Sequence, residues 1–167
     1  MNSITIIHIS DIHRDKGNPI SNEALLAALL LDIEKYKDLG IEKPDLLLVS
    51  GDIVRGIGFN ETVDELEKQY DEAFLFLQEL SNELFNGDKS RIVIVPGNHD
   101  VNWLTSKNSM DLIDDQKVIN DKGILKKEIY QQYLEHTSNI KWSWSDRKFY
   151  RIKDMDLYNS RFLEFKN

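Results

Sequence analysis

Cysteine is absent from this chain of 167 residues, and so is any apolar run of the roughly 20 residues that a membrane-spanning helix needs. Without thiolates, the available metal ligands are carboxylate, amide and imidazole groups. Basic residues are also scarce, because 21 Lys and Arg face 29 Asp and Glu. The resulting net charge of -8 argues against a broad nucleic-acid-binding face, although a local basic groove stays open. No secretory signal is visible at the N-terminus, so we expect a cytoplasmic location.

Strand and helix patterns alternate over the first hundred residues. Apolar runs bounded by turn-forming residues predict buried strands at 4–9, 46–49 and 92–95. Helical spacing predicts a helix from Pro19 to Leu39 and another from about Thr62 to Phe85. This order is typical of right-handed crossover units, in which helices cover a parallel sheet. We therefore expect an α/β fold. The predicted buried stripe of the second helix is Leu66, Tyr70, Ala73, Phe74, Leu77, Leu80 and Leu84.

The pattern is less regular after Val101. We expect a loop at 102–108, a weakly helical acidic stretch at 111–121, a helix at 124–136, a short strand at 147–152 and a closing helix at 155–165. Four aromatic residues in this part are expected to pack against the body of the domain rather than to form an exposed recognition surface: Trp142, Trp144, Phe149 and Tyr150. The length predicts a single domain over residues 1–167, with a motif-bearing core at 1–100 and a less regular helical extension at 101–167.

Polar residues suited to metal binding follow each predicted strand. Asp11 and His13 follow the first, Asp52 follows the second, and Asn98 and His99 follow the third. The carboxyl ends of parallel strands share one edge, where open α/β folds place their ligands, so these side chains should converge. A single Gly-Asp pair is usually an ordinary turn, but the conjunction of the three motifs is much more specific. We expect a metal site with Asp52 as the carboxylate that bridges two ions.

Together the motifs Asp-x-His, Gly-Asp and Gly-Asn-His-Asp resemble those of the calcineurin-like metallophosphoesterase family, over about the first hundred residues. The resemblance implies the N-terminal part of a four-layer α/β sandwich, with helices covering a largely parallel sheet. It implies a metal-dependent phosphoester hydrolase that uses metal-activated water and holds two divalent ions, drawn from Mn, Fe, Zn or Mg. Manganese is the first ion to assay.

The resemblance also assigns roles to individual residues. Asp11 and His13 would bind the first ion, Asp52 would bridge, and Asn98 would bind the second ion. The catalytic group would be His99, which protonates the leaving oxygen, and Asp100 would orient the site. Arg55 would contact the phosphate of the substrate, although simple solvation is the alternative for this side chain.

Two departures from the family pattern refine the expectation. The segment after Asp52 lacks the second Asp of the family's Ser/Thr protein phosphatases, which favours a phosphodiesterase, nuclease or nucleotidase. The family's later histidine ligands have no counterpart here, since only His136 follows His99, and a helix C-terminus explains it better than metal ligation. We therefore expect a chain incomplete at its C-terminus, completed by a missing C-terminal region, a partner chain or self-association, because half of the fold would expose apolar sheet surface.

The alternative function is a non-catalytic regulatory or protein-binding module with a degenerate metal site. A Rossmann-like nucleotide binder ranks below both, because no Gly-x-Gly-x-x-Gly fingerprint follows the first strand. His8, inside the first predicted strand, is expected to be a hydrogen-bonded core histidine.

Overall fold

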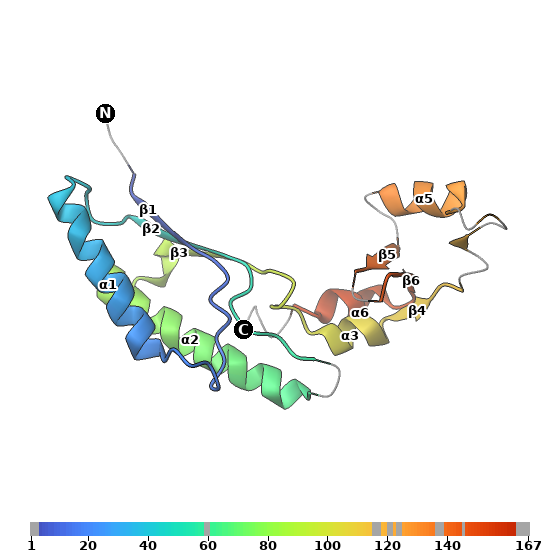
Figure 1. The fold of residues 1–167 in the computed structure, drawn as a ribbon, viewed down its shortest axis with the longest axis horizontal. Helices are drawn as coiled ribbons and strands as arrows, with labels where there is room; N and C mark the ends of the chain where they lie inside the picture. The colour runs from blue at the N-terminus through green and yellow to red at the C-terminus, as the bar shows by residue number, and fades with distance from the viewer. Residues whose placement is uncertain are drawn as a thin grey trace. The chain divides into compact units, whose positions relative to one another are not determined.

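The computed structural model describes residues 4–58, 61–114, 118–119, 122, 125–135, 139–144 and 146–162. The chain divides after Asn102 into two compact units, which are described separately below (Figure 1). The single domain expected over residues 1–167 stays a prediction, and His136 lies outside the described residues. No helix in the described ranges is both long and apolar enough to cross a membrane.

The first unit is built on a parallel sheet of three strands, in the order β1-β2-β3. The strands are β1 (Ile6–Ile9), β2 (Leu46–Ser50) and β3 (Ile92–Val95). Helix α1 (Asn22–Asp38) connects the first pair, and α2 (Val63–Phe85) with the short 3-10 helix η1 (Lys89–Arg91) connects the second. Both long helices lie on the same side of the sheet (Figure 1). The predicted α/β class with helices covering a parallel sheet is confirmed.

The helix ends follow from local sequence signals. The Ser21 side chain accepts a hydrogen bond from the Ala24 N–H (3.2 Å), so α1 begins with a capped turn. At the start of α2, the Glu65 carboxylate accepts a hydrogen bond from the Thr62 N–H (2.8 Å). Asn86 then ends α2 in the left-handed conformation, with φ of 54°. Both helices therefore begin and end within three residues of their predicted bounds.

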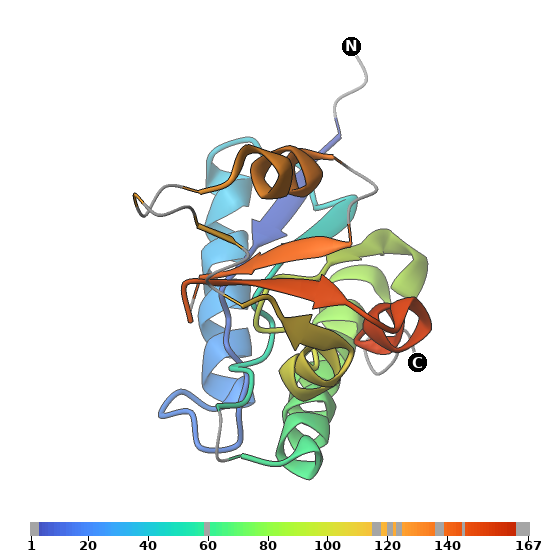
Figure 2. The same ribbon diagram turned by 90° about the vertical axis from the view of Figure 1, so that its right-hand side faces the viewer.

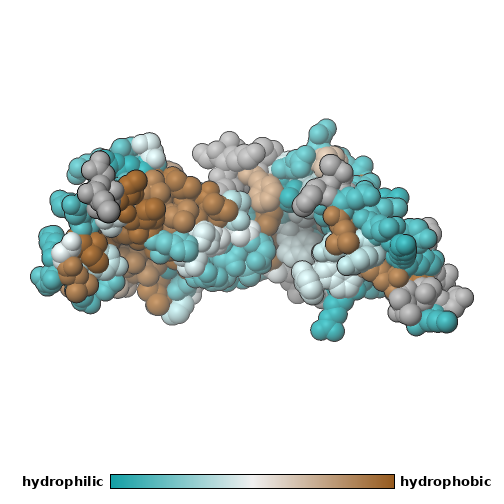
Figure 3. Space-filling model, turned by 90° about the horizontal axis from the view of Figure 1, so that it is seen from above, coloured by the Kyte–Doolittle hydropathy of each residue, from teal (hydrophilic) through white to brown (hydrophobic). Residues whose placement is uncertain are grey.

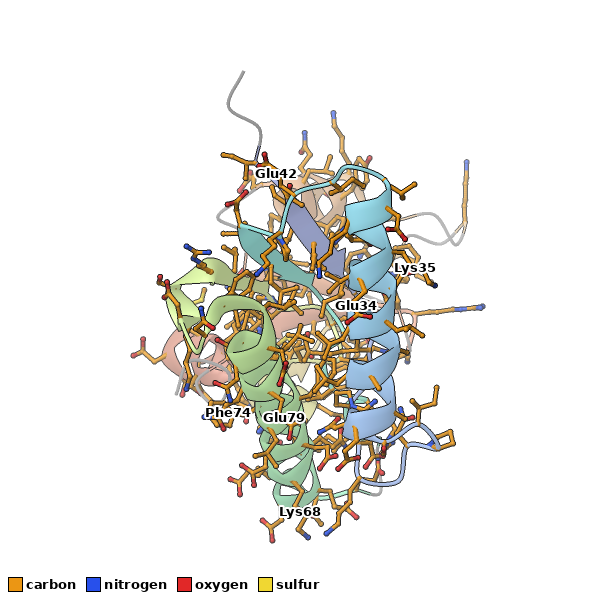
Figure 4. The ribbon with its side chains drawn as sticks, turned by 90° about the vertical axis from the view of Figure 1, so that its left-hand side faces the viewer. Glu34, Lys35, Glu42, Lys68, Phe74 and Glu79 are labelled. Atoms are coloured by element: carbon orange, nitrogen blue, oxygen red, sulfur yellow. The ribbon has the colours of Figure 1, made fainter. Side chains whose placement is uncertain are left out.

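The core of the first unit lies between the sheet and the two helices. Leu47 and Val49 of β2 are fully buried, and so is one face of α2. Phe74 was predicted to belong to that face, which is wrong: its side chain is 54% exposed and packs under the Lys89 ammonium group, 4.9 Å from the ring centre (Figure 4). The buried face of α2 consists of Leu66, Gln69, Ala73, Phe76, Leu80, Ser81 and Phe85.

No element among the described residues covers the opposite face of this sheet. Ile6, Val93 and Val95 are 54%, 42% and 50% exposed, and Figure 3 shows a continuous hydrophobic area on this unit. The prediction of buried strands is therefore wrong for this face, and the exposed apolar sheet surface implied by the family resemblance is present. His8 also lies here and is exposed rather than part of the core, with its Nε2 atom 2.6 Å from Ser50 Oγ.

The second unit contains an antiparallel sheet in the order β4-β6-β5 (Figure 2). Its strands are β4 (Met110–Leu112), β5 (Ile140–Ser143) and β6 (Lys148–Ile152). Three helices accompany them: α3 (Trp103–Asn108), α5 (Lys127–Leu134) and α6 (Met155–Ser160).

The predictions for this unit were partly right. The strand expected at 147–152 and the helices expected within 124–136 and 155–165 are confirmed. The loop expected at 102–108 is largely helix α3, and the start of the acidic stretch expected to be weakly helical is strand β4. A helical extension was therefore the wrong description. Strand β4 exists because it pairs with β6, about forty residues further along the chain, where Asp111 lies opposite Arg151.

Aromatic side chains of the second unit surround an open cavity of about 490 Å³, lined in part by Tyr130, Tyr133, Trp142, Trp144 and Phe149. Trp142 and Phe149 are partly buried against each other, with ring centres 4.8 Å apart, as predicted. Trp144 is 82% exposed, so the expectation that it packs into the body of the domain is wrong. Among the described residues, the one aromatic contact of Trp144 is with Trp142. The two rings are perpendicular, with centres 5.9 Å apart.

Candidate metal centre

The loops that follow β1 and β2 run side by side at the carboxyl edge of the parallel sheet. The Asp11 N–H donates to the Gly51 carbonyl oxygen (3.1 Å), and the His13 N–H donates to the Asp52 carbonyl oxygen (3.0 Å). These bonds continue the β1–β2 pairing beyond the ends of both strands. The Asp-x-His and Gly-Asp motifs are therefore fixed against each other by main-chain hydrogen bonds.

The backbone of these motifs adopts an unusual conformation. Asp11, His13 and Asp52 have φ values of 54°, 42° and 51°, in the left-handed region that side chains other than glycine rarely enter. Such conformations cluster at functional sites, where the surrounding structure holds the strain. Here the main-chain bonds between the two loops supply that restraint.

The Gly97-Asn98-His99-Asp100 turn packs directly on Asp52. A Cβ atom on Gly97 would lie 2.3 Å from Asp52 Oδ1 and 2.5 Å from Asp52 N, so only glycine fits at this position. The His99 N–H donates a hydrogen bond to Asp52 Oδ1 at 3.1 Å. The turn thereby orients the Asp52 carboxylate and brings Asn98 and His99 to the same edge of the sheet.

The side chain of Asp100 connects this turn to the Gly-Asp loop. It is fully buried, and its Oδ1 atom accepts hydrogen bonds from the N–H groups of Ile53 (2.7 Å) and Val54 (2.9 Å). Its Oδ2 atom accepts from the Gly97 N–H at 2.8 Å. The carbonyl oxygen of Asp100 accepts from the Tyr70 hydroxyl at 2.7 Å, which attaches the turn to α2. One carboxylate thus holds two site loops in register.

Three metal-ligating side chains meet at this edge. The ligand atoms of Asp11, His13 and Asp52 all lie within 4.8 Å of one another, and in the described part of the chain they form the one such group of three or more. Two ligands on opposite sides of a divalent ion such as zinc are about 4.0–4.4 Å apart, since each bond is about 2.0–2.2 Å long, so a small rotation of the side chains brings them to the distances that one ion needs. Carboxylate oxygen and imidazole nitrogen suit Mn, Fe, Zn and, for the oxygens, Mg. The residues therefore fit a divalent ion.

His99 completes the group of candidate site residues. Its ring meets the His13 ring edge to face, with centres 4.9 Å apart, and its side chain is exposed. Its Nδ1 atom lies 2.5 Å from the carbonyl oxygen of Arg55. Asn98, which precedes it, is also exposed at this edge.

Arg55 is held in an ion-pair network that sequence reasoning missed. Its Nε atom lies 2.6 Å from an Asp15 carboxylate oxygen, and one of its terminal nitrogens lies 2.5 Å from a Glu61 oxygen. The hydrogen bonds that Arg55 donates to Glu61, and then to Asp15, raise the pKa of Arg55. A phosphate contact by Arg55 stays a prediction, and it requires the phosphate to compete with these two carboxylates. No motif marks Asp15 or Glu61, because the loop conformation alone brings them to Arg55.

A second residue missed by sequence reasoning is Arg14, which directly follows His13. Its side chain is only 2% exposed and donates a hydrogen bond to the Ile20 carbonyl oxygen at 2.9 Å. Its guanidinium lies 5.9 Å from the centre of the Phe76 ring, and its Nε atom has no hydrogen-bond partner. A solvated arginine is the ordinary expectation for a loop, so the sequence gives no signal of this burial.

Comparison with known proteins agrees with the class of protein that this fold and site define. The family model described as Calcineurin-like phosphoesterase matches residues 4–163, and the chain belongs to this family. No curated protein and no solved structure matches the chain significantly. The family and the Asp11, His13 and Asp52 group together support a metal-dependent phosphoesterase as the general function.

Proposed function

We propose that this protein hydrolyses phosphodiesters or nucleotides, as a phosphodiesterase, nuclease or nucleotidase. The observation that carries the proposal is the convergence of the Asp11, His13 and Asp52 ligand atoms within 4.8 Å, beside the exposed ring of His99. Metal ions held by such a group would bind a phosphoester, and the accessible imidazole beside it can supply a proton to the leaving oxygen. The phosphodiester preference rests on the sequence after Asp52, where no second Asp follows.

In the proposed mechanism, Asp11 and His13 would hold one divalent ion, Asp52 would be shared, and Asn98 would contribute an amide oxygen to a second ion. When bound, such ions neutralise the charge of the phosphoryl oxygens and make water more acidic. His99 donates the proton to the leaving oxygen, since its ring is exposed at the site. Asp100 keeps the two loops in register through its three main-chain hydrogen bonds.

We propose manganese as the activating ion, with Fe, Zn and Mg as the other candidates. The three clustered side chains offer two carboxylates and one imidazole, a mixed oxygen and nitrogen set that suits Mn²⁺. The second ion would have fewer protein ligands, so it should bind more weakly than the first. Titration of the chelator-treated protein with each ion by calorimetry measures both the preference and the stoichiometry.

We further propose that the uncovered sheet face is covered by polypeptide in the cytoplasmic working form, as a further region of chain, a partner or a second copy. The support is the exposure of Ile6, Val93 and Val95 on one face of a parallel sheet, a class of sheet that is normally covered on both sides. The same face favours the alternative role of a protein-binding module. Val93→Lys should raise solubility and abolish any self-association seen by light scattering, without changing metal affinity.

The hydrolysis of bis-p-nitrophenyl phosphate with Mn²⁺ tests the proposed reaction. Asp52→Asn should lower metal affinity and activity together, and His99→Ala should lower activity while leaving metal affinity close to that of the wild type. Asp71→Asn, the same chemical change on the exposed side of α2, is the matched control. If both variants hydrolysed the substrate at the rate of the wild type, the mechanism would be refuted. Metal binding that survives Asp52→Asn would sink the assigned ligand set even in an inactive chain.

A further inference from the structure

The ring of His99 has one nitrogen whose protonation is dictated by its partner. Nδ1 lies 2.5 Å from the carbonyl oxygen of Arg55. A carbonyl oxygen can only accept a hydrogen bond, so Nδ1 must carry the proton. Nε2 is therefore the nitrogen that gains and releases a proton: it is bare in the neutral ring, and in the protonated ring it carries the proton that His99 would donate to the leaving oxygen.

The main chain around this contact leaves the ring little freedom. Gly56, which follows Arg55, is buried and has a φ of 77°. A Cβ atom on Gly56 would lie 3.1 Å from His99 Nδ1 and 3.1 Å from the His99 carbonyl oxygen. The imidazole therefore packs directly against the main chain, and the Arg55–Gly56 peptide determines its orientation.

The Arg55 side chain anchors that peptide to two neighbouring loop segments. Its three guanidinium nitrogens are all engaged: Nε with Asp15 at 2.6 Å, and the two terminal nitrogens with Glu61 at 2.5 and 3.3 Å. Glu61 also accepts a hydrogen bond from the Gly58 N–H at 2.6 Å. We call the three side chains Arg55, Asp15 and Glu61 the arginine clasp. The clasp joins Arg55 to Glu61, just before α2, and to Asp15 in the loop that follows His13.

The main chain of Arg55 is fixed at the same time. The Arg55 N–H donates to the Arg14 carbonyl oxygen at 3.2 Å, so the residue is bound to the Asp-x-His loop through both its backbone and its side chain. The hydrogen bond from Arg55 and a weaker one from the Gly58 N–H lower the pKa of Glu61. Partial burial opposes the same change in Asp15, but hydrogen bonds from Arg55 and the Gly17 N–H lower its pKa overall, so both carboxylates of the clasp are charged at neutral pH.

We propose that Arg55 is a positioning residue for His99: the arginine clasp holds the Arg55 carbonyl oxygen, which fixes the imidazole as the Nδ1–H form with Nε2 directed to the reaction. The catalytic consequence rests on the proposed function, whereas the fixed proton position does not. An arginine that already binds two carboxylates contributes to this site through its main chain.

The proton position can be read directly by long-range proton–nitrogen NMR of the metal-free protein, at a pH of about 8.5, well above the usual imidazole pKa of about 6.5. The chain has four histidines, and the spectrum of His99→Ala identifies the His99 signals by their loss. The wild type should show His99 as the Nδ1–H form. The double variant Asp15→Asn, Glu61→Gln should show a mixture of both forms. Glu67→Gln, an exposed change on α2, is the control and should match the wild type.

Hydrolysis rates provide the second measurement. The double variant should lose about tenfold in kcat with little change in KM, and Arg55→Lys, which keeps one cation in the clasp, should lose less. A wild-type Nε2–H form, or a double variant with the wild-type NMR pattern, would overturn the proposal. A wild type that shows the clasp-dependent Nδ1–H form, together with metal binding that survives Asp52→Asn, would leave the clasp standing and refute the proposed function instead.

Discussion

Gly97→Ala should be among the most damaging small substitutions in this protein. Its new methyl group would lie 2.3 Å from Asp52 Oδ1 and 2.5 Å from Asp52 N, and 2.9 Å from Gly51 Cα. Two of these atoms belong to the backbone, so no side-chain rotation relieves the overlap. The turn must move until the shortest contact reaches at least 3.0 Å.

That movement breaks or weakens the hydrogen bonds that join the turn to the Gly-Asp loop. The bond from the His99 N–H to Asp52 Oδ1 is 3.1 Å long, and the bond from the Ile53 N–H to Asp100 Oδ1 is 2.7 Å long. A hydrogen bond to a charged group contributes about 1.5–3 kcal/mol. We therefore expect the free energy of unfolding to fall by about 2–4 kcal/mol, on the assumption that one bond is lost and the other weakened.

Urea denaturation followed by circular dichroism measures the stability, and calorimetry measures Mn²⁺ affinity. Affinity should fall by about 10- to 100-fold, the usual effect of losing a group that orients a metal ligand. Gly17→Ala is the control, because the nearest atom to its new Cβ is 3.9 Å away, and its stability should stay within about 0.5 kcal/mol of the wild type. If Gly97→Ala matched this control in both measurements, the close packing described here would be refuted.

Three further substitutions test separate parts of the structure. Asp100→Asn should cost about 2–4 kcal/mol, because an amide N–H₂ would face a buried N–H donor, whereas Asp71→Asn should be nearly neutral; equal urea midpoints would contradict this. Arg14→Met should change the unfolding free energy by at most about 1 kcal/mol or increase it, because it removes a buried guanidinium with an unpartnered Nε; a loss above about 2 kcal/mol would contradict it. The Arg55 hydrogen bond lowers the pKa of Glu61, so its stabilising effect is present above about pH 4.5 and is lost as the pH falls through the lowered value. Glu61→Gln should therefore reduce the loss of unfolding free energy at acid pH. Curves of unfolding free energy against pH that run parallel for the two proteins would refute this.

The parallel half of the fold could be predicted from the sequence because its signals are local. Each strand is a short apolar run, each helix begins at a capping residue, and three strand ends carry polar motifs. The second unit was harder, since β4 contains only three residues and forms by pairing with β6 far along the chain. Phe74 and Phe76 illustrate a similar limit within one helix. Two aromatic residues two positions apart cannot both face the core, and only the packed structure selects Phe76.

The candidate site shows the same division between local and non-local information. The structure brings Asp11, His13 and Asp52 together as parallel strand ends require, and the turn with Asn98 and His99 packs beside them. The arginine clasp was beyond sequence reasoning, because no periodicity connects Asp15 with an arginine forty positions later. The complete burial of Asp100 could not be predicted either, since an aspartate in a turn is ordinarily solvated.

The left-handed backbone at the three clustered ligands has a consequence for how this site can change over generations. Asp, Asn and His are the side chains, after glycine, that enter this region most readily, and β-branched residues enter it least. Drift away from metal binding should therefore pass first through Asn or Gly at Asp11, His13 and Asp52, because these replacements leave the loops folded. A descendant that had lost catalysis would keep the shape of the sheet edge, and a Val or Ile at any of the three positions would mark the collapse of the loops themselves.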